Sequence, residues 1–266
     1  MASRGRVLAI GGSDSGGGAG IQADVKAITA LGGYAATAIT ALTAQNTLGV
    51  FGVVPVDPLF VDLQIEVVLN DLGADAIKIG MLYSRGIVDV VARRLRSLGR
   101  PIPFIVDPVM ISGSGTRLLD AEGRTALVKQ LLPLATLLTP NAPEAEAITG
   151  MPVRNVEGML HAADRLLLMG PEAVLIKGGH LEGDTVVDVL RTADGFERRF
   201  ESPRLRTTAG HGTGCTLASA IAVGLAEGMT LEGAVQEARK YVHEAIRTAP
   251  GYGSGVGPLN HGHPLE

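Results

Sequence analysis

Cysteine is almost absent from this sequence. Cys215 is the only cysteine in 266 residues, which excludes an internal disulfide and a zinc site built from cysteines. The histidines do not compensate for this absence. His180 and His211 adjoin glycine-rich segments without the spacing of metal ligands, and His161 and His243 fall in helical patterns. We therefore predict no transition-metal site, and any chemistry of Cys215 must be that of a single thiol.

Long apolar runs and clusters of positive charge are also missing. No stretch of 18 apolar residues occurs, and the apolar run at 7–10 is too short for the core of a signal peptide, so we expect a cytoplasmic protein with no membrane contact. The formal net charge is -4 and the pI is near 5.9. Because the largest basic cluster is the short RRLR at 93–96, we expect no nucleic-acid partner.

The common nucleotide-binding fingerprints are incomplete. Segment 10–24, IGGSDSGGGAGIQAD, resembles a phosphate-binding loop, and the pattern G-x-G-x-x-A begins at Gly18. That pattern needs an acidic residue about 20 positions later to hold a ribose, but no Asp or Glu occurs between Asp24 and Asp57. The sequence also lacks the Gly-Lys pair of a P-loop and a G-x-S-x-G nucleophile elbow. The structural alternative is a glycine-rich turn that lets a helix pack close to a sheet.

What the sequence does contain is an alternation of short β-branched runs with longer helical patterns. With 46% hydrophobic and 19% charged residues, the chain can form one sizeable core, and we expect a single α/β domain over 1–266 with a mostly parallel central sheet. Strands are predicted at 6–11, 35–42, 50–55, 75–80, 103–109, 136–139, 173–177, 185–191 and 196–201. Helices are predicted at 19–31, 58–71, 84–98, 121–132, 155–169, 213–227 and 231–247.

One pair of predicted strands differs from the others. TVVDVLR and FERRFE alternate in polarity and flank TADG, which predicts an antiparallel hairpin at one edge of the sheet. Ligands of such sheets bind beyond the carboxyl ends of the parallel strands. The polar and glycine-rich residues that follow the predicted strands are therefore the candidates for a functional site. The glycine-rich tail, GYGSGVGPLNHGH, suggests a loop that passes close to another part of the chain.

A second glycine-rich stretch covers 207–228. It runs from a Gly-His-Gly-Thr-Gly segment directly into a helical pattern, so free backbone amides of Gly212, Thr213 and Gly214 are expected to form an anion site. Cys215 falls in the first turn of this helix, where the helix dipole lowers the pKa of a thiol. The alternative for Cys215 is a buried cysteine that fills a small gap.

Three further segments carry polar residues at strand or helix ends. Asn141 and Glu144 stand three apart at the opening of a helix, where they could hold Mg²⁺ through water or form an ordinary capping box. Asp107 ends the strand FIVD and is a candidate metal or acid-base carboxylate, although Asp before Pro also starts turns. Lys177 ends an apolar strand before two glycines, where a charge needs an anion or a partner.

Taken together, these segments resemble one family. The motifs IGGSDSGGGAGIQADVKAITALGGYAATAITALTAQNT, KIGM, VDPVM, TPNAPEAEAITG, KGGH, HGTGCTLASAIA and GYGSGVGPLNH occur in the order found in hydroxymethylpyrimidine and phosphomethylpyrimidine kinases of thiamine biosynthesis. The resemblance implies the ribokinase-like fold, a three-layer α/β/α sandwich. It also implies phosphorylation of 4-amino-5-hydroxymethyl-2-methylpyrimidine and then of its monophosphate, with ATP and Mg²⁺.

The resemblance assigns roles to individual residues. Gln45 matches the glutamine that hydrogen-bonds the aminopyrimidine edge, a task for which an amide offers a donor beside an acceptor. Asn141 and Glu144 match the N-x-x-E motif linked to magnesium and phosphate, with Asp107 as a further metal candidate, and Lys177 would reach the ATP phosphates. The walls of the pyrimidine pocket would be formed by Gly12, Ala19, Met81 and Val109.

The resemblance also implies a catalytic arrangement. Backbone amides of Gly212, Thr213, Gly214 and Cys215 would form the anion hole, with Gly212 and Gly214 also contacting the nucleotide. Cys215 occupies the position where many ribokinase-like enzymes have an aspartate base, so we expect its thiolate to accept the hydroxyl proton. Two alternatives remain open, a pyridoxine or pyridoxal kinase and a catalytically silent sensor of the same fold. The resemblance further suggests a homodimer, with the edge hairpin as one contact.

Overall fold

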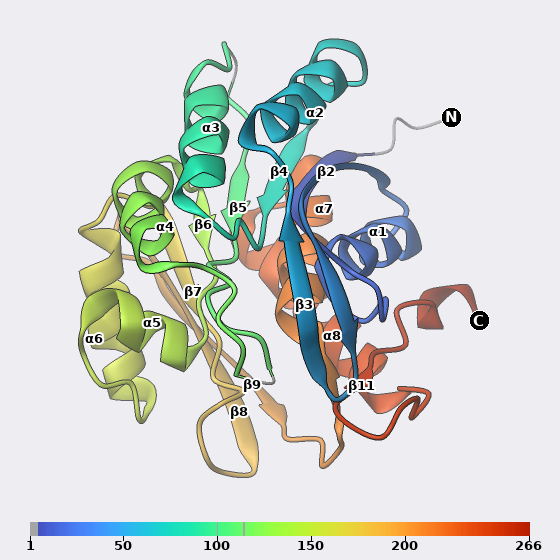
Figure 1. Ribbon diagram of the computed structural model, residues 1–266. Coiled ribbons are helices and arrows are strands. Elements are labelled where there is room, and N and C mark those ends of the chain that lie inside the picture. Colours follow the sequence, from blue (N-terminus) through green and yellow to red (C-terminus); the bar gives the residue numbers. More distant parts are fainter. Residues whose placement is uncertain (1–4, 100, 114) are drawn as a thin grey trace.

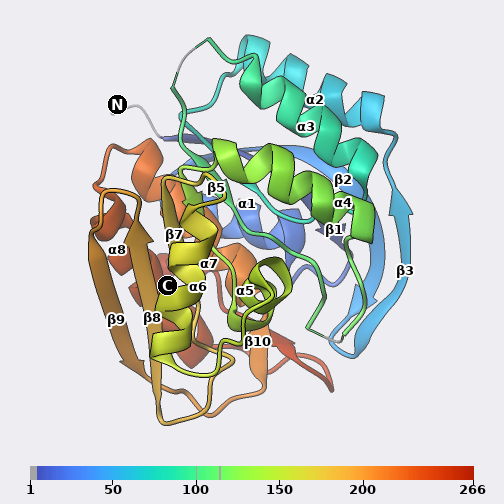
Figure 2. The same ribbon diagram turned by 90° about the vertical axis from the view of Figure 1, so that its left-hand side faces the viewer.

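A single twisted sheet organises the chain. The computed structural model describes residues 5–99, 101–113 and 115–266, and within them nine strands form one sheet in the order β3-β2-β1-β4-β5-β6-β7-β8-β9. Figure 2 shows this sheet from β3 at one side to β9 at the other. The strands are β1 (Arg6–Asp14), β2 (Tyr34–Asn46), β3 (Gly49–Pro55), β4 (Ala76–Ile79), β5 (Phe104–Val106), β6 (Leu137–Leu138), β7 (Ala173–Ile176), β8 (Thr185–Thr192) and β9 (Glu197–Pro203).

The centre of the sheet is parallel and both edges are antiparallel. Parallel pairing runs from β2 through β1, β4, β5 and β6 to β7. At one edge β8 and β9 form the predicted hairpin. At the other edge β2 and β3 form a second antiparallel pair, which the sequence did not suggest. This pair arises because β2 continues to Asn46 instead of ending near 42, so that Gln45 lies on a strand and not in a loop.

Helices cover both faces of the sheet and make the predicted α/β/α sandwich (Figure 1). The first core lies between the sheet and α2, α3, α4, α5 and α6, and the second lies between the sheet and α1, α7 and α8. The helices are α1 (Gly20–Ala30), α2 (Pro58–Asp71), α3 (Arg85–Arg96), α4 (Ala121–Ala126), α5 (Ala142–Thr149), α6 (Val156–Leu167), α7 (Thr213–Ala226) and α8 (Leu231–Arg247).

Alternation along the strands explains the two cores. In β4, Ile77 and Ile79 belong to the first core, whereas Ala76 belongs to the second, because successive side chains of a strand point to opposite faces. Lys78 points to the same face as Ala76 and is completely buried there. The predicted helix at 121–132 is shorter than expected, since α4 gives way to a π-helical turn and then to a 3-10 turn that contains Pro133, which lacks a backbone N–H.

The tail folds back on two earlier segments of the chain. β10 (Ala209–His211) pairs in parallel with β11 (Gly257–Pro258), and the N–H of Val256 donates to the carbonyl of Thr47 at 2.9 Å. The tail therefore passes close to the segment that leads into α7, as its glycines suggested. Among the described residues, none of the helices combines the length and the apolar character needed to cross a membrane.

Candidate functional site

Polar side chains gather at the carboxyl ends of the parallel strands, as the fold class predicts. Asp107 follows β5, Asn141 follows β6 and Lys177 follows β7. Asn141 and Lys177 form a bridge between the strand ends, and the N–H of Lys177 donates to the carbonyl of Pro140 at 2.9 Å. Segments that lie 34 to 70 residues apart in the sequence thus meet at one edge of the sheet.

Lys177 and Asp107 form an ion pair at this edge. Lys177 Nζ lies 2.7 Å from Asp107 Oδ1, and Thr139 Oγ1 donates to the same oxygen at 3.3 Å. Burial lowers the pKa of Lys177, but Asp107 and Glu144 raise it above its ordinary value, so the lysine is charged. A Cβ atom at Gly214 would lie 3.1 Å from Lys177 Nζ. A side chain at 214 would press on the end of Lys177, and both charged groups lie against the first turn of α7.

Asn141 and Glu144 form the capping box considered above. Asn141 Oδ1 accepts a hydrogen bond from the N–H of Glu144 at 2.9 Å, and Glu144 Oε2 accepts one from the N–H of Asn141 at 2.8 Å. Burial is the main reason that the pKa of Glu144 is raised to about 7. The charges of Lys177, which lowers this pKa, and Asp107, which raises it, have smaller effects. The cap positions a carboxyl group of unusually high pKa beside the Lys177–Asp107 pair.

The carboxylates fit a loosely held magnesium ion rather than a closed metal cage. Within 5–99, 101–113 and 115–266, no group of three or more His, Cys, Asp or Glu side chains lies close enough to hold a metal by itself. Mg²⁺ is commonly bound by one or two carboxylates together with substrate phosphates and water. Asp107 and Glu144 are a donor set of this kind.

The start of α7 has the geometry of an anion site. Gly212 precedes the helix with a φ of 82°, and the N–H of Thr216 makes the first helical bond, 2.9 Å to the carbonyl of Gly212. The amides of 213–215 come before that bond and have no acceptor within the helix. A Cβ atom at Gly212 would lie 1.9 Å from the carbonyl oxygen of Gly18. Glycine at 212 therefore serves both the left-handed turn and the close contact with the glycine-rich segment 10–20, which runs from the end of β1 to the start of α1 and is called the first loop below.

Cys215 lies in this first turn, but its pKa differs from the expectation. Burial raises the pKa of the thiol from 9.0 to about 11, although Lys78 and the backbone amide of Gly20 lower it. The prediction of a thiol pKa lowered by the helix dipole was therefore wrong, because desolvation outweighs the favourable charges. The thiol is protonated in the unliganded protein at neutral pH.

The predicted pocket residues lie around the same edge of the sheet. A Cβ atom at Gly12 would be 2.8 Å from Met81 Sδ, and Val109 packs against the small apolar cluster that contains Met81. Ala19 precedes α1, and its Cα lies 3.1 Å from the Cβ position of Gly212. The first loop therefore contacts both the Met81 cluster and the anion site.

Gln45 joins this group through His211. Gln45 Nε2 lies 3.1 Å from His211 Nε2, which in turn lies 2.9 Å from Asp14 Oδ2. Asp14 is buried in the first loop and accepts hydrogen bonds from the amides of Gly16, Gly18 and Ala19. Neither Asp14 nor His211 was predicted to have a role in the site. The signal for Asp14 was available, because it is the single carboxylate within the glycine-rich segment 10–20.

A second Lys–Asp pair lies beneath the site and was also missed. Lys78 Nζ lies 2.8 and 2.9 Å from the two carboxylate oxygens of Asp24, and Ser219 Oγ donates to Asp24 Oδ1 at 2.7 Å. Ser219 is one helical turn after Cys215 on α7. Lys177 was identified as a charged residue in an otherwise apolar strand. The same pattern occurs in AIKI and could have identified Lys78.

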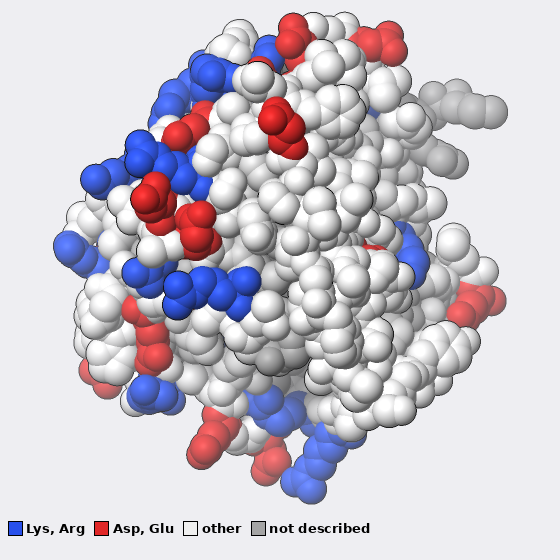
Figure 3. All heavy atoms as spheres, in the orientation of Figure 1, with Lys and Arg blue, Asp and Glu red and all other residues white. Residues whose placement is uncertain are grey.

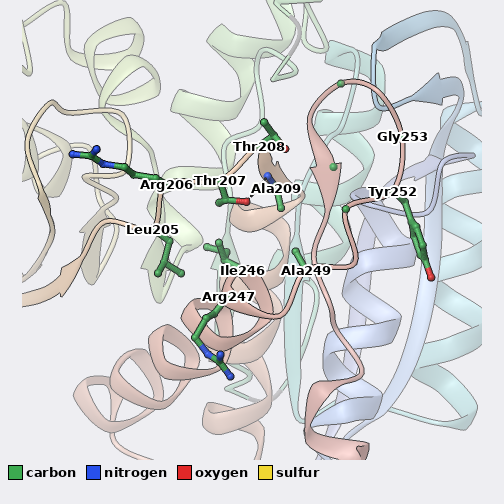
Figure 4. A pocket seen from close by; sticks show the side chains of 13 residues that line it. Leu205, Arg206, Thr207, Thr208, Ala209, Ile246, Arg247, Ala249, Tyr252 and Gly253 are labelled. Carbon is green, nitrogen blue, oxygen red and sulfur yellow. Dashed lines mark hydrogen bonds between the residues drawn. The ribbon is translucent and has the colours of Figure 1, made fainter.

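Two cavities flank the segment that carries His211. One, of about 260 Å³, lies between the residues before β10, the end of α8 and the tail (Figure 4). It is lined by 205–209, Ile246, Arg247, Ala249, 251–253, Gly255 and Gly257. The other, of about 390 Å³, is lined by Gly16, Gly18, 46–48, His211, 252–254 and Pro258. The second cavity therefore brings His211 together with Gly16 and Gly18, whereas neither cavity is lined by residues 213–215.

A three-layer sandwich with a lysine, two carboxylates and a glycine-flanked helix start at the carboxyl edge defines a ribokinase-like phosphotransferase. Residues 14–260 match the family model described as phosphomethylpyrimidine kinase. The chain belongs to the phosphomethylpyrimidine kinase family.

Curated relatives agree with this family. The chain is 48% identical over 258 residues to the thiamine biosynthesis bifunctional protein ThiED of Geobacter sulfurreducens, covering 97% of this chain and 52% of that protein. It thus spans about half the length of that relative. It is 46% identical over 259 residues to the hydroxymethylpyrimidine/phosphomethylpyrimidine kinase of Rhizobium meliloti, covering 96% of each.

Solved structures share the fold with two related activities. Phosphomethylpyrimidine kinase from Clostridium difficile is 43% identical with a TM-score of 0.81, over 91% of this chain and 100% of that one. Pyridoxal kinase from Staphylococcus aureus, in complex with AMP-PCP and pyridoxal, is 32% identical with a TM-score of 0.88, over 98% and 94%. The ribokinase-like fold expected from the sequence is confirmed.

Proposed function

We propose that this kinase transfers the terminal phosphoryl group of ATP to the hydroxymethyl oxygen of 4-amino-5-hydroxymethyl-2-methylpyrimidine. It then transfers a second phosphoryl group onto the monophosphate, which gives the diphosphate used in thiamine biosynthesis. The observation that carries the proposal is the convergence of Lys177, Asp107 and the amides of 213–215 at one edge of the sheet. The names of the relatives identify the pyrimidine as the acceptor.

Positioning and charge neutralisation account for the transfer. Phosphoryl transfer needs little covalent participation from the protein, so catalysis consists chiefly of aligning the reactants and stabilising the charge on the moving group. Lys177 supplies a fixed positive charge for the nucleotide phosphates, and the amides of 213–215 stabilise the oxygens of the transferred group. Asp107 and Glu144 would hold Mg²⁺, which neutralises phosphate charge when it is bound. Asn141 fixes the position of Glu144 through the capping box.

Cys215 is the proposed acceptor of the hydroxyl proton in the first transfer. Its pKa of about 11 makes the thiolate rare in the unliganded enzyme but strongly basic once it forms. The second transfer needs no comparable base, because the acceptor is already a phosphate anion. The two steps should therefore depend differently on Cys215.

The substrate pocket is proposed to be lined by the first loop and the Met81 cluster. Gly12 and Ala19 allow the backbone to approach a flat ring, while Met81 and Val109 offer apolar contact to its face. Gln45 would pair with the amino group and the neighbouring ring nitrogen. Gly212 and Gly214 would let the nucleotide phosphates approach the backbone.

An ADP-release assay tests these proposals. The wild type is offered hydroxymethylpyrimidine, its monophosphate and pyridoxal in separate reactions, and Cys215→Ala is compared with it. We expect Cys215→Ala to lose about 100-fold or more in turnover of hydroxymethylpyrimidine, to lose much less with the monophosphate and to retain ATP binding. Near-normal turnover of hydroxymethylpyrimidine by this variant would refute the role of Cys215. Absence of ADP release with every acceptor would favour the sensor.

Pyridoxal is the second candidate acceptor. The supporting observation is the similarity to pyridoxal kinase from Staphylococcus aureus over nearly the whole chain. Both acceptors are small heteroaromatic rings that carry a hydroxymethyl group. A kcat/KM for pyridoxal above that for hydroxymethylpyrimidine would make this the main activity, whereas turnover of the monophosphate would favour the thiamine pathway.

A homodimer is proposed through the β2–β3 edge of the sheet. Six of the exposed large apolar side chains lie on β3 and α2, and this part of the surface carries few charges (Figure 3). They are Phe51, Val54, Leu59, Phe60, Leu63 and Val67. The β8–β9 hairpin, the contact suggested from the sequence, is charged at 197–199 and Glu201 and suits an interface less well.

Sedimentation analysis tests the dimer. Phe51, 72% exposed, lies on the outer strand of that edge, so Phe51→Glu should shift the protein towards monomer. Arg199→Glu on the hairpin is the matched control and should leave the association state unchanged. The reverse pattern would assign the interface to the hairpin.

Domain organisation and location belong to the same proposal. We propose that residues 1–266 work as one kinase domain, since the family match covers 14–260 and one sheet connects the first and last parts of the site. Dependence on ATP makes the cytoplasm the expected location, which cell fractionation would test.

A further inference from the structure

His211 contacts both Asp14 of the first loop and Gln45 of β2, and it has no role in the proposed function so far. It lies on β10, between the first loop and Gln45, and its Cδ2 atom is 2.4 Å from the Cβ position of Gly18. Any side chain at Gly18 would displace the ring. The imidazole is therefore held in place by packing, with Nε2 directed at both Asp14 and Gln45.

The partner Asp14 determines the direction of the hydrogen bonds. Although burial alone would raise the pKa of Asp14, hydrogen bonds from His211 and from the amides of Ala19 and Gly16 bring it below its ordinary value. Asp14 is therefore a carboxylate at neutral pH and can only accept hydrogen bonds. Since His211 Nε2 lies 2.9 Å from Asp14 Oδ2, it must carry a proton and donate it.

This direction fixes the amide of Gln45. A protonated Nε2 cannot accept a hydrogen bond from an amide nitrogen, so the Gln45 atom 3.1 Å away must be the oxygen. A half-turn of the amide brings the oxygen there and puts the nitrogen 3.2 Å from Thr43 Oγ1. The single proton of that hydroxyl is donated to the carbonyl of Ser13 at 3.0 Å, which leaves its lone pairs free to accept from Gln45. In this arrangement every donor has an acceptor, and the single Nε2–H of His211 is shared between Asp14 Oδ2 and the Gln45 oxygen.

The opposite orientation is worse by simple counting. Two N–H donors, from His211 and Gln45, would then face each other, and the Gln45 N–H would have no acceptor at that place. A donor without an acceptor is unfavourable at a partly buried group, because the protein only partly replaces the hydrogen bond to water. The side chains of His211 and Thr43 therefore select a single orientation of the Gln45 amide.

We propose that His211 is a positioning residue that determines acceptor specificity by fixing the amide of Gln45. This inference rests on the proposed function, in which Gln45 contacts the substrate ring. One N–H and one lone pair of the fixed amide remain for a ligand, in a fixed order. That order suits a heteroaromatic ring with an amino group beside a ring nitrogen, which offers one donor and one acceptor. Pyridoxal offers two neighbouring oxygen acceptors, and an amide free to turn would discriminate less against it.

The protonation of the imidazole is directly measurable. In protein labelled with ¹⁵N, we expect His211 Nε2 to show a directly bonded proton at neutral pH, by two-dimensional NMR of the histidine side chains. Asp14→Asn, which offers a side-chain oxygen or nitrogen at the same place, serves as the comparison. An unprotonated Nε2 in the wild type would overturn the proposal.

The kinetic test compares two variants of the same residue. His211→Phe keeps a ring but removes the donor, and we expect the KM for hydroxymethylpyrimidine to rise about tenfold, with kcat and the KM for ATP changed by less than about twofold. The ratio of kcat/KM values for hydroxymethylpyrimidine and pyridoxal should fall by a similar factor. His211→Gln, which restores an N–H donor, should recover most of the difference. An unchanged KM, or an equal loss with both acceptors, would overturn the proposal.

Two further variants keep the test decisive if His211→Phe does not fold. Thr43→Val removes the acceptor on the other side of the Gln45 amide and should raise the same KM by a similar factor, without affecting the KM for ATP. No change with Thr43→Val would contradict the proposal.

Gln45→Leu separates the proposed substrate contact of Gln45 from the proposed positioning role of His211. If Gln45→Leu leaves the KM unchanged, the proposed substrate contact is wrong and the role of His211 falls with it. If only the His211 and Thr43 variants are silent, the substrate contact stands and the positioning role is wrong.

Discussion

Two Lys–Asp pairs lie near Cys215, and they differ in how completely their hydrogen-bonding groups are satisfied within the protein. Lys78 and Asp24 are fully buried, and both carboxylate oxygens of Asp24 are bonded within the protein. Lys177 and Asp107 share one contact, and the side chain of Lys177 is 13% exposed. The same chemical pair is therefore satisfied internally in one place and left open towards the anion site in the other. An incompletely satisfied pair at a strand end is a better indicator of function than the pair itself.

The largest effect is expected when the closed pair is broken. Lys78→Met leaves Asp24 buried without its partner and should lower the free energy of unfolding by about 3 to 5 kcal/mol. Chemical denaturation measures this loss. The double variant Lys78→Met/Asp24→Leu removes both charges and should recover much of the stability. A loss below about 1 kcal/mol in the single variant would show that the pair is not closed as described.

The open pair should respond in activity rather than in stability. Lys177→Met removes a charge proposed to stabilise the nucleotide phosphates, so kcat should fall by about 10² to 10³-fold. The thermal midpoint should change far less than in Lys78→Met, because Lys177 lies at the edge of the protein core. Steady-state ADP release and thermal unfolding on the same preparation provide the comparison. A variant with kcat within threefold of the wild type would contradict the distinction between the two pairs.

The pKa of the Cys215 thiol depends on charges in both pairs. With a pKa of about 11 instead of 9.0, the thiolate fraction of Cys215 at pH 8 should be about 100-fold smaller than in the denatured protein, and alkylation by iodoacetamide correspondingly slower. Because Lys78 is the main charge that lowers this pKa, Lys78→Met should slow alkylation further, and Lys177→Met should change it less. Equal rates in native and denatured wild type would contradict the raised pKa.

The same pKa has a consequence for stability in alkaline solution. Below pH 9 the thiol is protonated in both the folded and the unfolded protein, so it adds no pH dependence. Between pH 9 and 11 it ionises in the unfolded chain but not in the folded one, and the free energy of unfolding should fall as the pH rises. Cys215→Ser should show a smaller fall over this range.

The smallest effect is expected from an exposed pair, which provides a baseline for the other two. Arg198 Nε lies 3.3 Å from Glu232 Oε1, and the two side chains are 54% and 41% exposed. Glu232→Gln should change the free energy of unfolding by less than about 1 kcal/mol and leave kcat unaltered. A larger loss of stability would mean that exposure alone does not separate the pairs.

The fold was predictable because it depends on local patterns. The alternation of apolar runs and helical segments specified the parallel sheet, and the Asp-Gly turn specified the β8–β9 hairpin. The second hairpin was missed because the segment 34–46 contains no turn residue near 42, so its length could not be judged. Residues at strand ends, such as Asp107 and Lys177, were found by the same reasoning that located the sheet.

The remainder of the site depends on contacts between distant segments. Asp14 and His211 are 197 residues apart, and no local pattern connects them. The pKa of Cys215 was predicted in the wrong direction because sequence shows the helix start but not the depth of burial. Lys78 shows the limit most clearly, since its strand resembles that of Lys177 and only the three-dimensional contact with Asp24 separates them.

The contact between Gly18 and Gly212 also has a consequence for the order in which the protein is made. At about 5 to 20 residues per second, the ribosome adds the segment around Gly212 roughly 10 to 40 s after the first loop. Throughout that interval the contacts of the first loop with Gly212 and His211 cannot form, although β1 and β2 can already pair. The nascent chain can therefore build much of its sheet well before it can bind either substrate, and catalytic competence should be among the last properties that it acquires.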